Sequence, residues 1–168
     1  MSAIPSCGVP QRVDTTYFRQ AMSQFATGVT VITARLPGGA PCGVTINSFN
    51  SVSLDPPLVL WSLAHTASTM AAFGIAEASY VINVLAGDQV DLAQRFAHQA
   101  PDHFATLPCR LTAEGVPVLG GTVAWFECRH RSRYTEGDHD IFVGAVERCH
   151  FHPHRTLGFH RGRFIAIS

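Results

Sequence analysis

A run of short, uncharged polar side chains lies between two apolar stretches in the first half of the chain. Residues 43–57 have the sequence GVTINSFNSVSLDPP, between GVTVITA and LVLWSL. The hydrogen-bonding side chains of this run include Asn47, Ser48, Asn50, Ser51 and Ser53. Such side chains either bind a neutral polar ligand or satisfy the backbone of their own turn, as Ser and Asn often do. The residues alone favour the second interpretation.

Several enzyme classes leave no signature in the chain. The motifs GxGxxG, GxxxxGK[ST], GxSxG and HExxH are all absent, which argues against a Rossmann unit and against acyl or phosphoryl transfer. Hydride transfer is different, because it mainly needs two flat rings held about 3–3.5 Å apart. A site that is poor in acids and bases is compatible with that chemistry.

Three of the nine histidines alternate near the C-terminus as His150, His152 and His154. Alternate residues of a strand share a face, so at least two of these side chains could bind one metal ion. Pro153 would interrupt the strand there. We therefore predict no metal site.

The composition indicates one compact, charge-poor domain. The chain has 168 residues, of which 46% are hydrophobic and 14% are charged, and its formal net charge is zero. High apolar content favours a wide interface, most simply a homodimer. The sequence has no basic patch of the kind that binds nucleic acid. No apolar run approaches the roughly 18 residues that a membrane span needs. We predict a flexible N-terminus over 1–13 and one domain over 14–168.

Cysteine usage and the N-terminal residues bear on the cellular compartment. The five cysteines are scattered and include no CxxC pair, which favours a reducing cytoplasm. The first ten residues, MSAIPSCGVP, do not show the order of a charged segment followed by an apolar one that a signal peptide requires. The expected location is cytoplasmic.

The elements that position these residues are mainly strands. A helix is predicted over 14–26 with Asp14 as its N-cap, and a hairpin is predicted from 27–35 and 42–49 around the turn LPGGA. Further strands are predicted over 58–64, which we expect to be fully buried, and over 80–85, 121–135, 139–152 and 158–168. Further helices are predicted over 66–74, with Thr66 as N-cap, and over 88–99, with Val90, Leu92, Ala93 and Phe96 turned inward. Trp61 and Trp125 are assigned to the core. Sequential strands with few helices favour a barrel with helical excursions.

Four segments together resemble the short flavin reductases of two-component flavin-dependent monooxygenases. They are FATGVTVIT (25–33), GVTINSFNSVSLDPPLVLWSLA (43–64), YVINVLAGDQVDLAQRFA (80–97) and GDHDIFVGAV (137–146). The resemblance extends from about Phe18 to Phe164. It implies a mainly β, homodimeric, Greek-key-like fold, the FMN-binding split β-barrel. It also implies a flavin groove near the dimer interface, with NADH or NADPH stacked on the exposed face of the flavin.

The resemblance implies a set of flavin-binding residues. Thr45, Asn47 and Ser48 would donate hydrogen bonds to the polar edge of the flavin ring, and backbone groups near Ser62 would line its other side. The full implied set is Thr45, Ile46, Asn47, Ser48, Ser51, Ser62, Leu63, Ala64, Ser68, Thr69, Arg95 and Phe96. Neutral donors suit the uncharged oxidised ring and also stabilise the negative charge that develops on reduction.

The resemblance also implies a phosphate contact at Ser68 and Thr69, at the start of a predicted helix. The family often has Lys or Arg just before this Ser, whereas this chain has His65 nearby. The phosphate contact is therefore expected to be weaker or dependent on pH. Arg95 and Phe96 would cover the flavin, across the dimer or within one chain.

His139 is the catalytic residue that the resemblance implies. It follows Gly137 and Asp138 at the turn between the two longest predicted strands. The resemblance places its imidazole against the nicotinamide, where it would hydrogen-bond a carboxamide or a pyrophosphate. The alternative is an ordinary hairpin residue. The segment 161–164 also matches the Arg-Gly-Arg-aromatic sequence near the family's C-terminus, with a nucleotide or interface contact as its expected role.

The sequence thus predicts an NAD(P)H-dependent flavin reductase that reduces FMN or FAD and supplies the reduced flavin to a partner monooxygenase. The main alternative is a non-catalytic flavin-binding protein of the same fold, a carrier or sensor. A related oxidase acting on pyridoxamine phosphate would need more basic residues for its substrate phosphate. The choices between FMN and FAD and between NADH and NADPH stay open.

Overall fold

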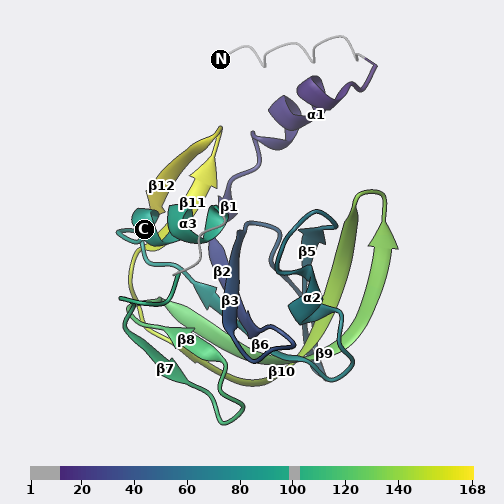
Figure 1. Cartoon of the computed structure of the whole chain (residues 1–168). Helices are drawn as coiled ribbons and strands as arrows, with labels where there is room; N and C mark the ends of the chain where they lie inside the picture. The colour runs from purple at the N-terminus through teal and green to yellow at the C-terminus, as the bar shows by residue number, and fades with distance from the viewer. Residues whose placement is uncertain (1–11, 99–102) are drawn as a thin grey trace.

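The computed structural model of the chain describes residues 12–98 and 103–168 (Figure 1). Residues 1–11 of the predicted flexible N-terminus lie outside the described residues, as does residue 99 of the predicted helix over 88–99. Within the described ranges no helix combines the length and the apolarity needed to cross a membrane.

One antiparallel sheet of seven strands makes up most of the fold, in the order β3-β2-β6-β9-β10-β5-β4 (Figure 1). Its strands are β2 (Thr30–Arg35), β3 (Pro41–Ile46), β4 (Asn50–Leu54), β5 (Pro57–Ala64), β6 (Ser79–Val84), β9 (Ala124–Glu136) and β10 (His139–Phe151). The predicted hairpin around LPGGA is confirmed as β2 paired with β3. The sheet ends at β3 and β4 and does not close into a barrel, so only the mainly β part of the predicted fold is confirmed.

Two smaller sheets flank the large one, and both differ from the prediction. The single last strand predicted over 158–168 is wrong, because β11 (Thr156–His160) and β12 (Arg163–Ile167) form a hairpin beside β1 (Thr27–Gly28). The break falls at Arg161 and Gly162, which have positive φ of 50° and 75° and therefore form a turn. A further hairpin of β7 (Cys109–Leu111) and β8 (Pro117–Leu119) was not predicted.

The first helix, α1 (Thr15–Met22), begins as predicted. The Asp14 carboxylate accepts a hydrogen bond of 2.8 Å from the backbone N–H of Tyr17, which satisfies one of the free donors of the first turn. The helix has no buried residue and projects from the body of the molecule (Figure 1).

The other two helices lie near the predicted positions. α2 (Met70–Phe73) has four residues and its N-cap is Thr69, so the prediction of Thr66 as N-cap is wrong, although the helix ends at Gly74 as expected. α3 (Val90–Ala97) packs on β3 and β2. Its Ala93 and Phe96 side chains are buried, and Val90 and Leu92 are partly buried, which confirms its inward face.

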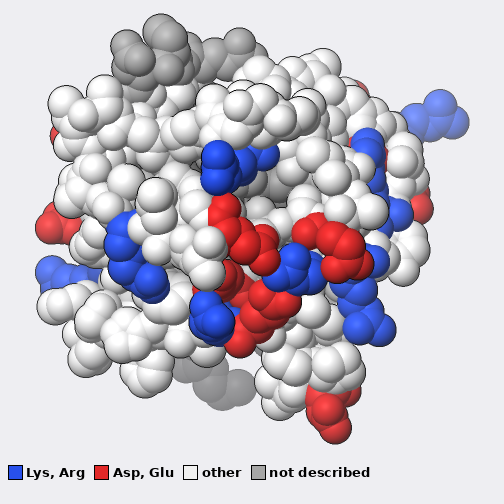
Figure 2. Space-filling view, turned by 60° about the horizontal axis from the view of Figure 1, so that its bottom comes forward, with Lys and Arg blue, Asp and Glu red and all other residues white. Residues whose placement is uncertain are grey.

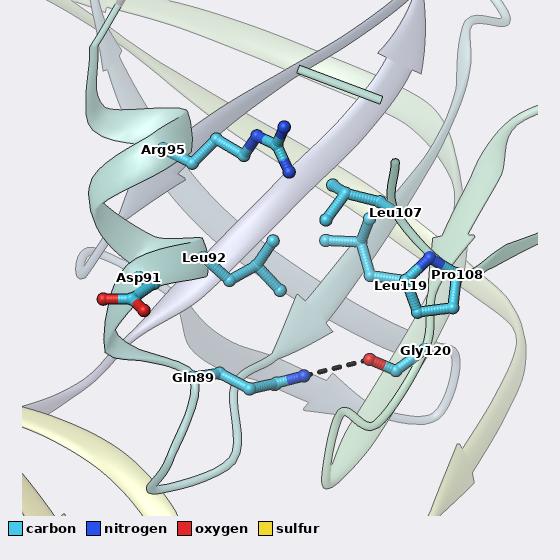
Figure 3. A pocket seen from close by; sticks show the side chains of 8 residues that line it. All are labelled: Gln89, Asp91, Leu92, Arg95, Leu107, Pro108, Leu119 and Gly120. Atoms are coloured by element: carbon cyan, nitrogen blue, oxygen red, sulfur yellow. Dashed lines mark hydrogen bonds between the residues drawn. The ribbon is translucent and has the colours of Figure 1, made fainter. Parts of the chain in front are cut away.

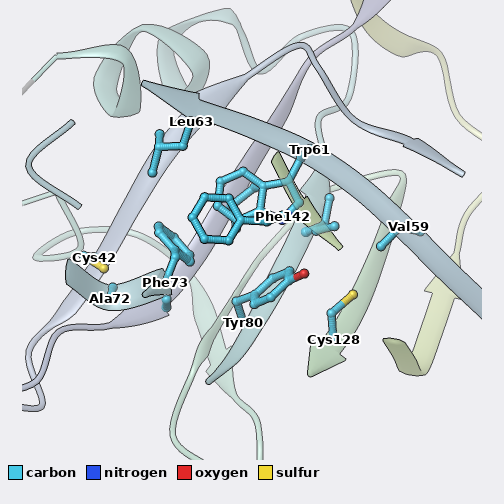
Figure 4. Close-up of a cluster of buried hydrophobic side chains, with 12 residues drawn as sticks. Cys42, Val59, Trp61, Leu63, Ala72, Phe73, Tyr80, Cys128 and Phe142 are labelled. Atoms are coloured by element: carbon cyan, nitrogen blue, oxygen red, sulfur yellow. The ribbon is translucent and has the colours of Figure 1, made fainter. Parts of the chain in front are cut away.

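An aromatic cluster forms the main core between β5, β6, β10 and α2 (Figure 4). The Trp61 and Phe142 rings stack with centroids 4.6 Å apart, and the Phe73 and Tyr80 rings meet Trp61 edge-on. Stacked and edge-to-face pairs add to the stabilisation that burial alone provides. The core assignment is therefore confirmed for Trp61.

Two predictions about burial need correction. β5 is not fully buried: Val59, Trp61 and Leu63 face the core, while the residues between them are partly exposed, as in a strand with one solvated face. Trp125 is only partly buried, and the Arg110 guanidinium lies over its ring at 4.3 Å from the centroid.

Candidate functional site

The uncharged polar run crosses from the end of β3 into β4, and it contacts β5 at one point. The Ser48 hydroxyl accepts a hydrogen bond from the Ser62 backbone N–H at 2.9 Å and donates to the Ser62 carbonyl at 3.2 Å. These two bonds join segments that are 14 residues apart in the chain. The structure therefore brings residues 45–48 and 62–64 together, as the flavin-site prediction requires.

Two hydroxyls of the run are already engaged within the chain. Thr45 donates to the Ala93 carbonyl at 2.6 Å, which ties β3 to α3, and the Ser48 hydroxyl is bonded to Ser62. Both hydroxyls therefore bind backbone groups of distant segments, and not the backbone of their own turn as the local interpretation expected. Asn47 is exposed to solvent and has its amide available at this surface.

The end of β5 lies directly beside the turn that carries His139. Ala64 is the register partner of His139, and the His65 backbone N–H donates to the Asp138 carbonyl at 3.0 Å. Gly137 has a φ of +62°, a conformation that glycine adopts without strain. The predicted nicotinamide residue therefore lies next to the predicted flavin-lining residues.

The imidazole of His139 is exposed and pairs with its neighbour. Its Nδ1 atom lies 2.6 Å from Asp138 Oδ1, and 47% of the side chain is accessible. The hydrogen bond to His139 lowers the pKa of the Asp138 carboxyl. One nitrogen of the His139 ring thus contacts the Asp138 carboxylate, and the rest of the ring is accessible to solvent.

A second group of predicted residues lines a hollow of about 790 Å³. Ser68, Thr69 and Phe96 line it together with Gly43. The Thr69 hydroxyl oxygen is buried and has no hydrogen-bond partner among the described residues. A buried hydroxyl normally has a partner, and this oxygen, one of several unpartnered buried atoms among the described residues, would have to turn toward the hollow to bind a ligand there. The helix that follows is a single turn, however, so its dipole contributes less to phosphate binding than the longer predicted helix would.

Phe96 forms a wall of this hollow. Its side chain is buried and packs against the backbone of β3, since a Cβ atom on Gly43 would lie 2.7 Å from the ring. The ring also stacks on His103 with centroids 5.1 Å apart. The space beside Phe96 therefore depends on glycine at position 43.

Arg95 is the predicted residue that the structure separates from the others. It lines a different hollow, of about 500 Å³, on the side of α3 that faces Leu107, Pro108 and Leu119 (Figure 3). Adjacent helix residues point about 100° apart, and Arg95 and Phe96 accordingly line different hollows. Their contact with one flavin stays a prediction.

Asp140 was missed by the sequence analysis. Its side chain is fully buried, and it accepts hydrogen bonds from Arg133 Nε at 2.8 Å, Thr135 Oγ1 at 2.8 Å and His65 Nε2 at 3.1 Å. A second guanidinium nitrogen of Arg133 binds the same oxygen. Burial tends to raise the pKa of Asp140, but these donors outweigh it and lower the pKa to about 2. Asp140 shares the inward face of β10 with Phe142, and that alternation was the available signal.

Acidic and basic side chains are interleaved over the face seen in Figure 2, and neither sign dominates that face. In the segment 161–164, Arg161 bonds to the carbonyl of Ser23 and to the side chain of Gln24, so it anchors the residues that follow α1. The His150 and His152 rings meet at 4.6 Å, but the described residues include no group of three or more His, Cys, Asp or Glu side chains arranged for a metal ion.

Comparisons with known proteins agree on one family. The family profile "Flavin reductase like domain" matches residues 22–168. The FMN reductase (NADH) SmoA of Agrobacterium fabrum is 46% identical over 160 residues, which cover 95% of this chain and 90% of that protein. The reductase component of the flavin-dependent trigonelline monooxygenase of Acinetobacter baylyi is 42% identical over 148 residues. The match covers 88% of this chain but only 47% of that relative.

Solved structures give the same result. The NADH:FAD oxidoreductase SgcE6 of Streptomyces globisporus, in complex with NAD and FAD fragments, superposes with a TM-score of 0.87 at 35% identity, covering 95% of this chain and 98% of that one. The styrene monooxygenase flavin reductase of Pseudomonas putida S12 superposes with a TM-score of 0.81 at 32% identity, covering 90% and 97%.

Proposed function

The chain belongs to the family of flavin reductase like domains, and from this premise we propose that it is an NAD(P)H-dependent flavin reductase. It reduces FMN or FAD by hydride transfer and supplies the reduced flavin to a partner monooxygenase. The relatives named as monooxygenase reductase components support the second step.

The observation that carries the proposal is the meeting of three segments at the end of β5. Ser48 holds the polar run against Ser62, and two residues further along the strand Ala64 pairs with His139. One ligand of the size of a flavin can contact the first two segments, and a second flat ligand can approach from the turn. This juxtaposition is what hydride transfer between two stacked rings needs.

The residues proposed to hold the flavin follow from these positions. Asn47 offers an exposed amide. The backbone of Ser62, Leu63 and Ala64 is proposed to line the other side of the flavin, although the Ser48 hydroxyl already binds the N–H and the carbonyl of Ser62. The buried Thr69 hydroxyl, beside Ser68, is proposed to bind the phosphate end. When bound, flavin supplies the ring atom that accepts the hydride. The absence of a fixed cation among these residues favours release of the reduced, more negative flavin.

His139 is proposed to orient the nicotinamide. The bond to Asp138 holds one ring nitrogen, and the other nitrogen is left to hydrogen-bond a carboxamide at the open face of the turn. The predicted contact of Arg95 with flavin across a dimer stays a prediction.

Exposed apolar side chains support the proposed homodimer. Phe18, Met22 and Phe25, in and after α1, are 53%, 52% and 69% exposed, and Ile165 and Ile167 of β12 are also exposed. A second copy that covers α1 would bury these side chains. The cytoplasmic location stays a prediction from cysteine content.

The proposal is tested by following NADH and NADPH oxidation at 340 nm with added FMN or FAD. Fast oxidation that depends on free flavin is the expected result. A chain that binds flavin without catalysing this oxidation would contradict the proposal and indicate a carrier or sensor instead.

A further inference from the structure

Asp140 is a buried charge at the edge of the candidate site, and the proposed function gives it no role. Both of its carboxylate oxygens are occupied: Oδ2 binds the Arg133 guanidinium, and Oδ1 binds Thr135 and His65. Taking a charge out of water is costly unless such partners surround it, so a fully buried carboxylate with this set of donors holds its neighbours in a narrow geometry.

The donors reach Asp140 from two parts of the fold. Arg133 and Thr135 lie on β9, the partner strand of the same hairpin, whereas His65 lies just beyond β5. The Arg133 guanidinium also lies against the end of α2, because a Cβ atom on Gly74 would be 3.1 Å from it. The carboxylate therefore fastens the β9–β10 hairpin to the segment that runs from β5 into α2.

His65 makes this connection twice. Its backbone N–H donates to the Asp138 carbonyl at 3.0 Å, and its ring nitrogen Nε2 lies 3.1 Å from Asp140 Oδ1. The carboxylate requires the ring hydrogen on Nε2, since an ionised carboxylate can only accept. Ser68 and Thr69 lie three and four residues after His65 in the chain. His139 lies between Asp138 and Asp140, the two residues that His65 contacts.

We propose that Asp140 is a positioning residue, which acts through His65 to fix the loop of residues 65–69 relative to the turn of residues 137–139. This inference rests on the proposed function, in which the loop holds the phosphate end of the flavin and the turn holds the nicotinamide. Both ligands keep their own contacts when the link is lost, but the two rings no longer align. Misplacement by about 1 Å is enough to slow a reaction between bound groups on the order of 100-fold.

The test is a single-turnover measurement with Asp140→Asn. Enzyme in excess over FMN is mixed with NADH, and the rate constant of flavin reduction is followed at 450 nm by stopped flow. We expect this rate constant to fall roughly tenfold. The Kd of FMN and the NADH concentration for half-maximal rate should change less than threefold. FMN is the limiting reagent, so partial unfolding leaves the rate constant unchanged as long as folded enzyme stays in excess over FMN and above its Kd. A merely structural role would therefore not produce the result.

Two further variants make the test specific. Glu147→Gln breaks an arginine–carboxylate pair between the same two strands, away from the turn, and should leave the rate constant unchanged. His65→Ala removes the link but leaves Asp140 bound to Arg133, so it serves if Asp140→Asn does not fold. The double variant His65→Ala/Asp140→Asn should be no slower than the slower single variant, because both act through one contact.

The outcomes separate the two proposals. One outcome is that the wild type reduces flavin while His65→Ala, and Asp140→Asn if it folds, reduce it with rate constants within twofold of the wild-type value. This result overturns the positioning role and leaves the proposed reductase function intact. A wild type that does not reduce flavin overturns the reductase and the positioning role with it.

Discussion

Two arginines of β9, four residues apart, bind carboxylates in opposite surroundings. Arg129 bonds to Glu147 at 2.7 Å and to Glu114 at 2.5 Å, and both of these carboxylates are more than 40% exposed. Arg133 bonds to Asp140, which has no exposed surface. Both arginines bind carboxylates, but Asp140 is removed from water and has two further donors, Thr135 and His65.

This difference changes what each pair can do. Exposed ion pairs gain little, about 0–1 kcal/mol, because water and salt screen them and the free side chains are well solvated. A buried carboxylate has no water to replace a lost partner, so its donors are held in place. Arg129 therefore forms only weakly stabilising ion pairs at the surface of the hairpin. Arg133 and Asp140 instead fix the end of the hairpin that carries His139.

The largest expected effect comes from removing each arginine in turn. Arg133→Ala leaves the Asp140 charge buried without its main donor, and we expect the thermal midpoint to fall by roughly 10 °C. Arg129→Ala should lower it by only about 1–3 °C. Circular dichroism melts of the two variants measure this contrast directly. Equal losses would show that burial does not distinguish the two pairs.

Acid should likewise lower the stability contributed by the buried pair of Arg133 and Asp140 more than that contributed by the exposed pairs of Arg129. The pKa of Asp140 is about 2 in the folded chain, against about 3.9 for an unfolded Asp, so its contribution is present above pH 4 and is lost as the pH falls toward 2. We expect Asp140→Asn to lose less stability than the wild type between pH 4 and pH 2. Arg129 lowers the pKa of the Glu114 carboxyl, but this carboxyl is exposed, so Arg129→Ala should reduce the wild-type loss less than Asp140→Asn does. Thermal midpoints at several pH values provide the measurement.

The turn that the buried pair holds should respond through nicotinamide binding. His139→Ala removes the ring proposed to orient the nicotinamide, so we expect the KM for NADH to rise several-fold while the Kd of flavin stays nearly unchanged. Steady-state kinetics and flavin fluorescence titration measure the two constants. An unaltered KM would remove His139 from the site.

The smallest effect on stability is expected from the exposed pair of Arg129 and Glu147. Glu147→Gln removes the charge that accepts two hydrogen bonds from Arg129, which keeps Glu114, and the thermal midpoint should shift by no more than about 2 °C. Raising the salt concentration should reduce even this difference, because screening already weakens the wild-type pair. A larger shift, or one that salt does not reduce, would mean that this pair is not screened as its exposure implies.

Local patterns predicted most elements of the fold and part of the site. Asp14 was identified as a cap from its type and position, and the hairpin of β2 and β3 from its β-branched first strand and the turn LPGGA. The juxtaposition of residues 45–48 with Ser62 came from a resemblance, because no local pattern states which strands meet. A sequence motif does not record the direction in which each helical side chain points, so the sequence did not show that Arg95 and Phe96 line different hollows.

The misses share a cause in long-range packing. The C-terminal strand was expected to be continuous because Arg161 is not a typical residue for a positive φ, whereas in the fold its backbone N–H bonds to Ser23. Trp125 was placed in the core by its type, but the strand exposes one of its faces to Arg110. Asp140 went unnoticed because a single acidic residue on an inward face has no meaning until its donors are known.

The amino-acid sequence determined the short-range structure, since capping, turn formation and strand alternation depend on neighbours a few residues away. It also determined the chemical character of the site, which is neutral and hydrogen-bonding. Tertiary structure alone decided which carboxylate lost its water and which donors replaced that water. Burial is a property of all the segments that surround a side chain, and those around Asp140 come from positions as far apart in the chain as His65 and Arg133.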